Sequence, residues 1–236
     1  MCVIIVMEKK VPSLDIFQRC ERANGDGGGI AWKEGGKVHW KKGIKADEIF
    51  NIATEKGPGC VAHFRIGTIG GKVPELCHPF PVTKKAETSL EGSAERVIFH
   101  NGHWSKWDDW CQQMVLMNNA YFPGGDWSDS RAIAWLIFHS NSSFLRFANQ
   151  KVVMMSGKKA DTYYGSWEEK DGVFYSNLHW DHQYTKTSYG HCGAYVPPAT
   201  GGNVNESKVS VEVKAAELNR LKEEVDKFYE QTHPCY

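Results

Sequence analysis

The chain opens with residues 2–7 (CVIIVM), an unbroken run of β-branched and apolar side chains. Such a run predicts a buried strand. Similar runs at 59–68 and 95–102 predict two more strands, each ending in glycine and polar residues. The later stretches KVVMMSG, TYYGSW and GVFYSN predict further strands, and we expect the last two to pair around the Lys-Asp-Gly turn at 170–172.

Segments whose apolar residues have helical spacing lie between groups of these strands and after the last of them. The expected helices cover 12–23, 46–56, a stretch that contains Trp107 and Trp110, the segment SDSRAIAWLIFHS with Ser128 as its N-cap, and 210–231. A hairpin is expected around Gly35-Gly36. Strands are followed by helices and then by strands again, which favours an α+β layered domain over a doubly wound parallel sheet.

The composition divides the 236 residues into three regions. Residues 1–180 carry all the expected strands and are long enough to form one sizeable core. Residues 181–209 are polar and rich in glycine and proline, which predicts a loop or linker. Residues 210–236 form the last region, whose expected amphipathic helix carries Leu218, Leu221, Val225 and Phe228 at helical spacing.

Charge and cysteine content exclude several classes of protein. Lys+Arg and Asp+Glu both number 28, and the zero net charge argues against binding to nucleic acid or an anionic membrane. The short apolar stretch at the start, with its charges after it, is not expected to be a secretory signal, and no apolar run is long enough to span a bilayer. The seven cysteines are odd in number and lack C-x-x-C spacing, so we expect a protein of the reducing cytoplasm without a disulfide framework or a cysteine-rich zinc site. We also expect no metal and no cofactor. His179, His182, His191 and Cys192 could suggest a zinc site, but Cys192 is isolated and the segment is a predicted loop, so we expect none there.

Polar residues that could carry chemistry lie at the ends of the predicted strands. Cys2 begins the first predicted strand, and removal of Met1 would place a thiol and a free α-amine on this one residue. Asn101 and Gly102 carry N–H groups that could stabilise an oxyanion. Arg65 could bind a carboxylate and Asp129 an ammonium group. Together these groups would form a site that cleaves an amide bond.

The same segments resemble the class II glutamine amidotransferase domain of the N-terminal nucleophile (Ntn) superfamily, in particular the small standalone members found in bacteriophages and bacteria. The resemblance covers about residues 2–180. It rests on six stretches and on their order: Cys2-Val3-Ile4, Gly25-Asp26-Gly27, HFRIGTIG at 63–70, His78-Pro79-Phe80, His100-Asn101-Gly102, and Ser128-Asp129-Ser130.

The resemblance implies a fold and a role for each site residue. The fold would be a four-layer αββα sandwich, here followed by the C-terminal amphipathic helix. Cys2 would attack the side-chain amide of glutamine or another γ-glutamyl compound, releasing ammonia and then glutamate through a thioester. Asn101 and Gly102 would form the oxyanion hole. Arg65 and Thr68 would bind the α-carboxylate, and Asp129 the α-amine. A separate synthetase subunit could use the ammonia.

The chain departs from the family at two places. Val3 stands where the family usually has glycine, and Ala23-Asn24 stand where many members have arginine. These departures leave open a catalytically inactive Ntn-fold protein with a binding or structural role. Taken singly, each site residue also has a structural interpretation. Arg65 would form an ion pair. Asp129 would be an acidic residue in the first turn of a helix, where the helix dipole favours it, and Asn101-Gly102 would form a turn. His63, His78 and His100 would be core or loop histidines.

Overall fold

The computed structural model describes residues 2–67, 69–146 and 150–181. These residues form four α-helices and eleven strands, most of them in antiparallel pairs, so the α+β class is confirmed. The predicted linker at 181–209 lies outside the described residues apart from Asp181, and the predicted helix at 210–231 lies outside them entirely. In the described part, no helix is both long and apolar enough to cross a membrane.

The larger sheet has seven strands in the order β10-β11-β1-β4-β2-β3-β6. Its strands are β1 (Val3–Met7), β2 (Gly28–Glu34), β3 (Lys37–Ile44), β4 (Cys60–Phe64), β6 (Glu91–Ala94), β10 (Glu168–Lys170) and β11 (Val173–Tyr175). The first predicted strand thus lies inside the sheet, between β11 and β4. Every residue of β1 is buried, as its unbroken apolar run predicts.

The smaller sheet has four strands in the order β5-β7-β8-β9. Its strands are β5 (Phe80–Pro81), β7 (Arg96–Asn101), β8 (Lys151–Ser156) and β9 (Thr162–Tyr164). We expected TYYGSW to pair with GVFYSN, and this prediction is wrong. β9 pairs with β8 in the smaller sheet, whereas β10 forms the hairpin with β11 in the larger one.

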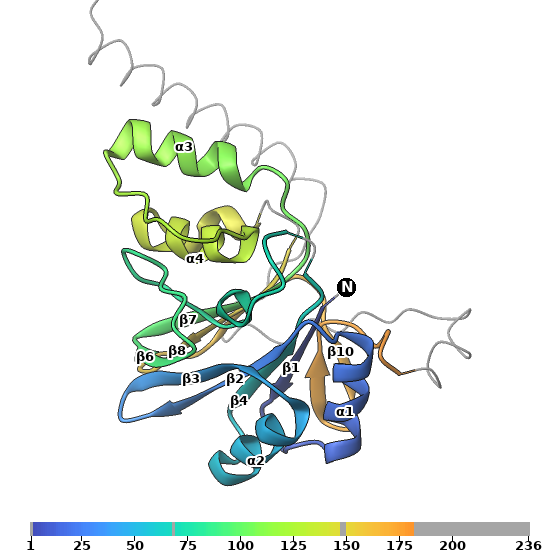
Figure 1. Ribbon diagram of the computed structural model, residues 1–236. Helices are drawn as coiled ribbons and strands as arrows, with labels where there is room; N and C mark the ends of the chain where they lie inside the picture. The colour runs from blue at the N-terminus through green and yellow to red at the C-terminus, as the bar shows by residue number, and fades with distance from the viewer. Residues whose placement is uncertain (1, 68, 147–149, 182–236) are drawn as a thin grey trace, which may run out of the picture. The chain divides into compact units, whose positions relative to one another are not determined.

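Alternate residues of β1 pack on different elements because side chains along a strand point to opposite faces. Val3, Ile5 and Met7 pack with helices α1 (Leu14–Ala23) and α2 (Ala46–Lys56). Ile4 and Val6 pack on the opposite face with Phe99 and other residues of β7 and β8. The two sheets therefore share one apolar layer, and α1 and α2 cover the outer face of the larger sheet (Figure 1).

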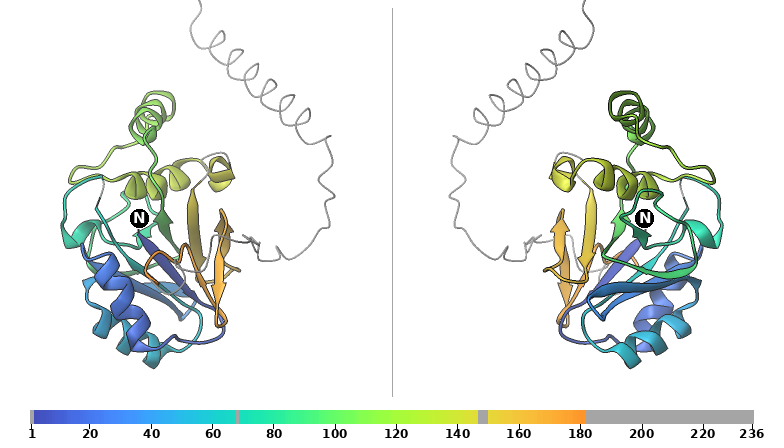
Figure 2. Two further views of the ribbon diagram at one scale, coloured as in Figure 1. Left: turned by 90° about the vertical axis from the view of Figure 1, so that its right-hand side faces the viewer. Right: turned by 90° about the vertical axis from the view of Figure 1, so that its left-hand side faces the viewer.

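The smaller sheet is covered on its other face by helix α4 (Asp129–His139), against which α3 (Trp107–Asn118) packs. Ile98 and Val152 point from the smaller sheet into this second core. Figure 2 shows the pair α1/α2 and the pair α3/α4 on opposite sides of the stacked sheets. The remaining helical elements are two 3-10 turns, η1 (Pro74–Leu76) and η2 (Ser142–Arg146).

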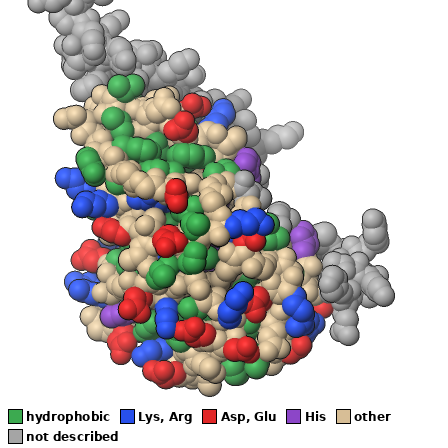
Figure 3. Space-filling view, viewed as in Figure 1, with side chains coloured by type: hydrophobic (Ala, Val, Ile, Leu, Met, Phe, Trp, Pro, Cys, Tyr) green, Lys and Arg blue, Asp and Glu red, His purple; other side chains and the backbone are tan. Residues whose placement is uncertain are grey.

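The outer surface differs between the two helical ends. Figure 3 shows apolar side chains gathered over the end that carries α3 and α4, and intermixed basic and acidic side chains over the end that carries α1 and α2. Large exposed apolar residues at the α3 end include Trp110, Leu116, Met117 and Tyr121. On the viewed face the two signs of charge alternate, in keeping with the zero net charge.

A buried lysine on β3 predicts a particular dependence of stability on pH. Lys42 is 1% exposed and donates hydrogen bonds to the carbonyl oxygens of Glu75 and Pro79. Burial lowers the pKa of its ammonium group to about 7. Above this pH the folded protein holds the amine neutral while the unfolded chain still binds the proton, so the free energy of unfolding rises with pH.

We expect this rise to be up to about 2.7 kcal/mol between pH 7 and pH 9, since one pKa unit corresponds to about 1.36 kcal/mol. Buried histidines titrate below this range. The buried thiols act in the opposite direction to Lys42, because their raised pKa keeps them protonated in the fold while the unfolded chain loses thiol protons at about pH 8.5. The Lys42 contribution is therefore measured as the difference between the wild type and Lys42→Met, since both proteins carry the same thiols. Lys42→Met should remove the rise, whatever its effect on the stability at pH 7. Denaturant unfolding of both proteins at the two pH values measures the difference. An equal change in the free energy of unfolding of both proteins would show that Lys42 makes no such contribution.

Candidate functional site

The site lies at one end of the sheets because antiparallel pairing brings different strand ends together. Val3 at the start of β1 pairs with Phe64 at the end of β4, and Phe64 also pairs with Gly28 at the start of β2. Cys2 directly precedes Val3 and Arg65 directly follows Phe64, so the antiparallel pairing makes Cys2 and Arg65 neighbours. β7 ends at Asn101, whose side chain reaches the backbone of Cys2.

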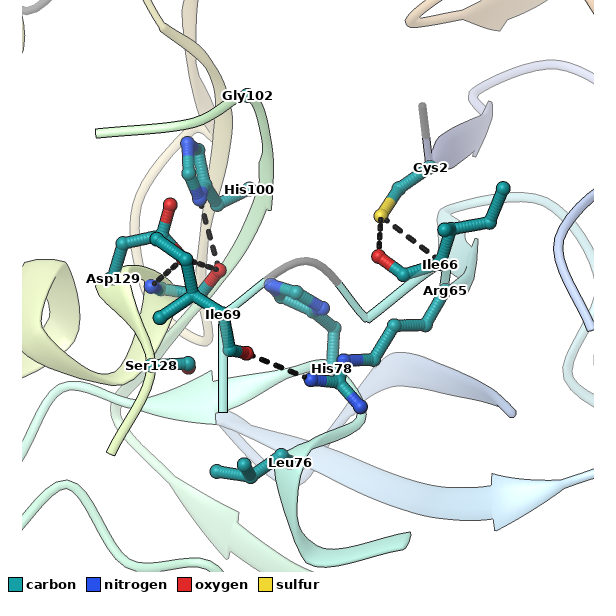
Figure 4. Close-up of a pocket in the computed structure, with 11 residues that line it drawn as sticks. Cys2, Arg65, Ile66, Ile69, Leu76, His78, His100, Gly102, Ser128 and Asp129 are labelled. Carbon is teal, nitrogen blue, oxygen red and sulfur yellow. Dashed lines mark hydrogen bonds between the residues drawn. The ribbon is translucent and has the colours of Figure 1, made fainter. Parts of the chain in front are cut away.

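A pocket with an empty volume of about 300 Å³, part of it open to solvent, lies at this end (Figure 4). Four of the six predicted site residues line it: Cys2, Arg65, Gly102 and Asp129. Asn101 lies beside the pocket without lining it, and Thr68 lies outside the described residues. The pocket is completed by Ile66, Ile69, Leu76, His78, His100, Ser128 and Ser130.

The thiol of Cys2 is held by the backbone of Ile66. Its Sγ donates to the carbonyl oxygen at 3.4 Å and accepts from the N–H at 3.3 Å. Burial raises the pKa of the thiol, although the Ile66 N–H and the charge of Arg65 act in the opposite direction. The thiol is therefore protonated at neutral pH, and a nucleophilic reaction at this sulfur needs a base to remove the proton.

Two amide side chains fix the backbone of Cys2. Asn101 and Asn177 each donate from Nδ2 to the Cys2 carbonyl oxygen at 2.7 Å. Asn101 Nδ2 also donates to Ser176 Oγ at 2.7 Å. Both N–H groups of the Asn101 amide are thus bonded in this structure. An oxyanion could receive a hydrogen bond from Asn101 only by replacing one of these two partners.

The guanidinium of Arg65 is enclosed by the loop that follows β4. Its two terminal nitrogens donate to the carbonyl oxygens of Ile69 at 3.1 Å and Gly71 at 2.8 Å. A Cβ on Gly67 would lie 3.1 Å from the guanidinium carbon, so the planar group packs closely on this glycine. These bonds use two of the five N–H groups of the arginine. They hold the plane of the guanidinium while the side chain lines the pocket.

Asp26 anchors the same loop from the other side. Its carboxylate accepts from the N–H of Gly67 at 2.9 Å and forms an ion pair with Lys72 at 3.0 Å. The pKa of Asp26 is lowered, first by the Gly67 hydrogen bond and then by Lys72. Gly27 has φ +118°, and a Cβ there would lie 2.5 Å from Cys77 Sγ. The Gly25-Asp26-Gly27 segment therefore shapes the loop that carries Ile66.

Asp129 begins helix α4, whose N-cap is Ser128 as predicted. Its carboxylate accepts from the backbone N–H groups of Trp104 at 3.0 Å and Ser130 at 2.8 Å. The aspartate is 6% exposed, and in the described part of the chain neither it nor Arg65 forms an ion pair. The two opposite charges thus line one pocket without being paired with each other.

His100 and Gly102 form the wall of the pocket near α4. His100 Nδ1 is 2.9 Å from Ser130 Oγ, and His100 Nε2 is 2.9 Å from Gln150 Oε1. A Cβ on Gly102 would lie 1.7 Å from the same Gln150 oxygen, so no side chain fits there while Gln150 keeps this position. Burial lowers the pKa of His100, and its imidazole is neutral at physiological pH.

Sequence reasoning missed several residues that build the site. His78 and Ser130 lie within segments used for the resemblance, but neither was predicted to have a role. Asn177 and Ser176 directly follow β11, just as Asn101 ends β7. A polar residue at the end of a buried strand is the signal that could have found them. The described residues contain no group of three or more His, Cys, Asp or Glu side chains suited to a metal ion.

Comparisons with known proteins give matches only among solved structures. No family model and no curated protein matches the chain. One similar structure is glutamine phosphoribosylpyrophosphate (PRPP) amidotransferase from B. subtilis complexed with ADP and GMP, with 14% identity, a TM-score of 0.49, and coverage of 74% of this chain and 41% of that chain. Another is described as the allosteric regulatory enzyme of purine biosynthesis, with 18% identity, a TM-score of 0.49, and coverage of 74% and 40%. The chain spans about two fifths of the length of each.

Proposed function

We propose that the chain is a glutamine amidotransferase-like amidohydrolase with the four-layer αββα arrangement of the N-terminal nucleophile superfamily. The observation that carries the proposal is the single pocket lined by Cys2, Arg65 and Asp129. A nucleophile, a cation and an anion from three separate segments meet there, and the two charges are not paired with each other. A free amino acid with an amide side chain carries the complementary groups.

In the proposed reaction, removal of Met1 first turns the nitrogen of Cys2 from an amide into an amine. The amine accepts the thiol proton, and Sγ attacks the side-chain carbonyl carbon of glutamine. The C–N bond then breaks, and ammonia leaves with the transferred proton. Water attacks the resulting thioester, releasing glutamate and restoring the thiol. The ammonia is either released or used by a separate synthetase subunit.

The charged side chains bind the other end of the substrate. Arg65 binds the α-carboxylate, since a planar guanidinium held in one orientation suits a carboxylate. Asp129 binds the α-ammonium group. Gly102 and Asn101 supply donors to the oxyanion, Asn101 after exchanging a present hydrogen bond. Thr68 contributes to carboxylate binding. The reaction uses no metal or cofactor, and a reducing cytoplasm keeps Cys2 as a thiol.

The test of this function is covalent labelling combined with intact mass. Protein isolated from cells should begin at Cys2, and an electrophilic glutamine analogue should add one label per chain. Peptide mapping should place the label on Cys2 rather than on the other six cysteines. Excess L-glutamine should slow the labelling, because both compounds occupy the same pocket. Full retention of Met1 in a preparation that hydrolyses glutamine would rule out the amine as the base.

An inactive binding protein remains the second candidate. It is favoured by Val3 and by the hydrogen bonds that already occupy both N–H groups of Asn101. Such a protein would bind glutamine or glutamate without releasing ammonia. The two candidates separate in one experiment: L-glutamine raises the melting temperature in both, but only the enzyme converts it to glutamate.

A further inference from the structure

His78 is a buried side chain in the candidate pocket that the proposed reaction leaves without a role. It lies between η1 and β5, is 3% exposed and lines the pocket with Cys2 and Asp129. Neither of its ring nitrogens makes a hydrogen bond within the described part of the chain. In Figure 4 its ring lies between the side chains of Asp129 and Arg65.

Aromatic neighbours hold the His78 ring in place. The ring of His63 lies 4.0 Å away between centroids, and Phe80 meets the His78 ring edge-on at 5.2 Å. These contacts would serve a phenylalanine equally well. A phenylalanine would also avoid burying two polar nitrogens without partners, which lowers stability. Packing therefore explains the ring at this position but not its nitrogens.

The imidazole of His78 is neutral at physiological pH. Burial lowers its pKa well below the usual value, and the neighbouring His63, His100, Arg65 and Lys42 act in the same direction. A neutral imidazole carries one N–H donor and one acceptor nitrogen. It can therefore bond a polar group in the pocket without adding a second positive charge beside Arg65, which would repel a substrate ammonium group.

We propose that His78 is a further substrate-binding residue, whose ring N–H donates to the α-carboxylate of the γ-glutamyl substrate beside Arg65. The inference rests on the proposed function, because it takes the same pocket and the same amino acid. Arg65 supplies the charge that attracts the carboxylate, and two of its N–H groups are already bonded to the loop. His78 supplies a directed donor that fixes the orientation of the carboxylate.

The experiment measures L-glutamine binding by calorimetry on a Cys2→Ala background, which prevents turnover. His78→Phe keeps the ring and removes the donor, and we expect it to weaken binding by about tenfold to a hundredfold, the range for a lost hydrogen bond to a charged group. His78→Gln restores a donor and should recover part of the affinity. If His78→Phe does not fold, His78→Leu makes the same comparison.

His63→Phe is the matched control. His63 packs against His78 with the rings tilted by 44° and is fully buried, but it does not line the pocket, so its variant should bind within about threefold of the background. Equal losses in both variants would overturn the inference, because ring packing alone would explain them. Unchanged binding by both His78→Phe and His78→Leu would overturn it while the proposed function stands. If the Cys2→Ala background itself binds no L-glutamine, the proposed function falls and the inference with it.

Discussion

Cys2→Ala is expected to lower the rate of ammonia release from L-glutamine by at least about four orders of magnitude. Loss of a covalent nucleophile commonly has effects of this size or larger, because the remaining groups cannot form the thioester. Folding should change little, since Cys2 is only partly buried and its sulfur contacts the Ile66 backbone. A coupled assay for glutamate, with unfolding of the same preparation followed in parallel, measures both quantities.

Cys60→Ala is the control for loss of a thiol in the same sheet. Cys60 pairs with Met7 at the opposite end of β1 from Cys2, and its side chain lies in the core with α1 and α2. Its replacement should reduce stability modestly and leave turnover unchanged. If Cys2→Ala kept a tenth or more of the wild-type rate, another group would be the nucleophile and the assignment of Cys2 would be wrong.

Much of the fold was predictable because local patterns determine single elements. The apolar run at 3–7, the N-cap Ser128 and the Gly35-Gly36 turn each act within a few residues, and all three appear where they were expected. Strand partners depend on distant contacts. TYY was assigned to the wrong partner because both possible hairpins have suitable turns, and only packing between the sheets decides between them. β6 was missed because Glu91–Ala94 contains no β-branched residue.

The sequence predicted which residues form the candidate site better than it predicted the hydrogen bonds that these residues make. Cys2, Arg65 and Asp129 could be proposed because each carries distinctive chemistry next to an expected strand or helix. The hydrogen bonds of Asn101 could not be predicted, because they depend on the registers that bring the ends of β7 and β11 to Cys2. The open nitrogens of His78 likewise result from packing among His63 and Phe80, which are distant from each other in sequence.

Asn101→Ala is expected to lower turnover of L-glutamine by about two to three orders of magnitude. In the proposed reaction the Asn101 amide donates to the oxyanion after giving up one of its present partners, and loss of one donor to an oxyanion typically has this effect. The structure adds a second role, since the same nitrogen holds the Cys2 carbonyl oxygen and Ser176 Oγ. Steady-state kinetics of the variant therefore report both roles together, and a further variant must separate them.

Asn177→Ala provides that separation. Asn177 donates to the same Cys2 carbonyl oxygen at the same distance, 2.7 Å, but it was not predicted to face the oxyanion. If Asn101 served only to position Cys2, the two alanine variants would slow turnover to a similar extent. The oxyanion role requires Asn101→Ala to be slower than Asn177→Ala by at least about tenfold, with the difference in kcat rather than KM, because the oxyanion exists only in the transition state and the intermediate. Equal kcat values would leave Gly102 as the proposed oxyanion donor and Asn101 as a positioning residue. Unfolding of Asn101→Ala alone would show instead that its bond to Ser176 Oγ is needed for the fold.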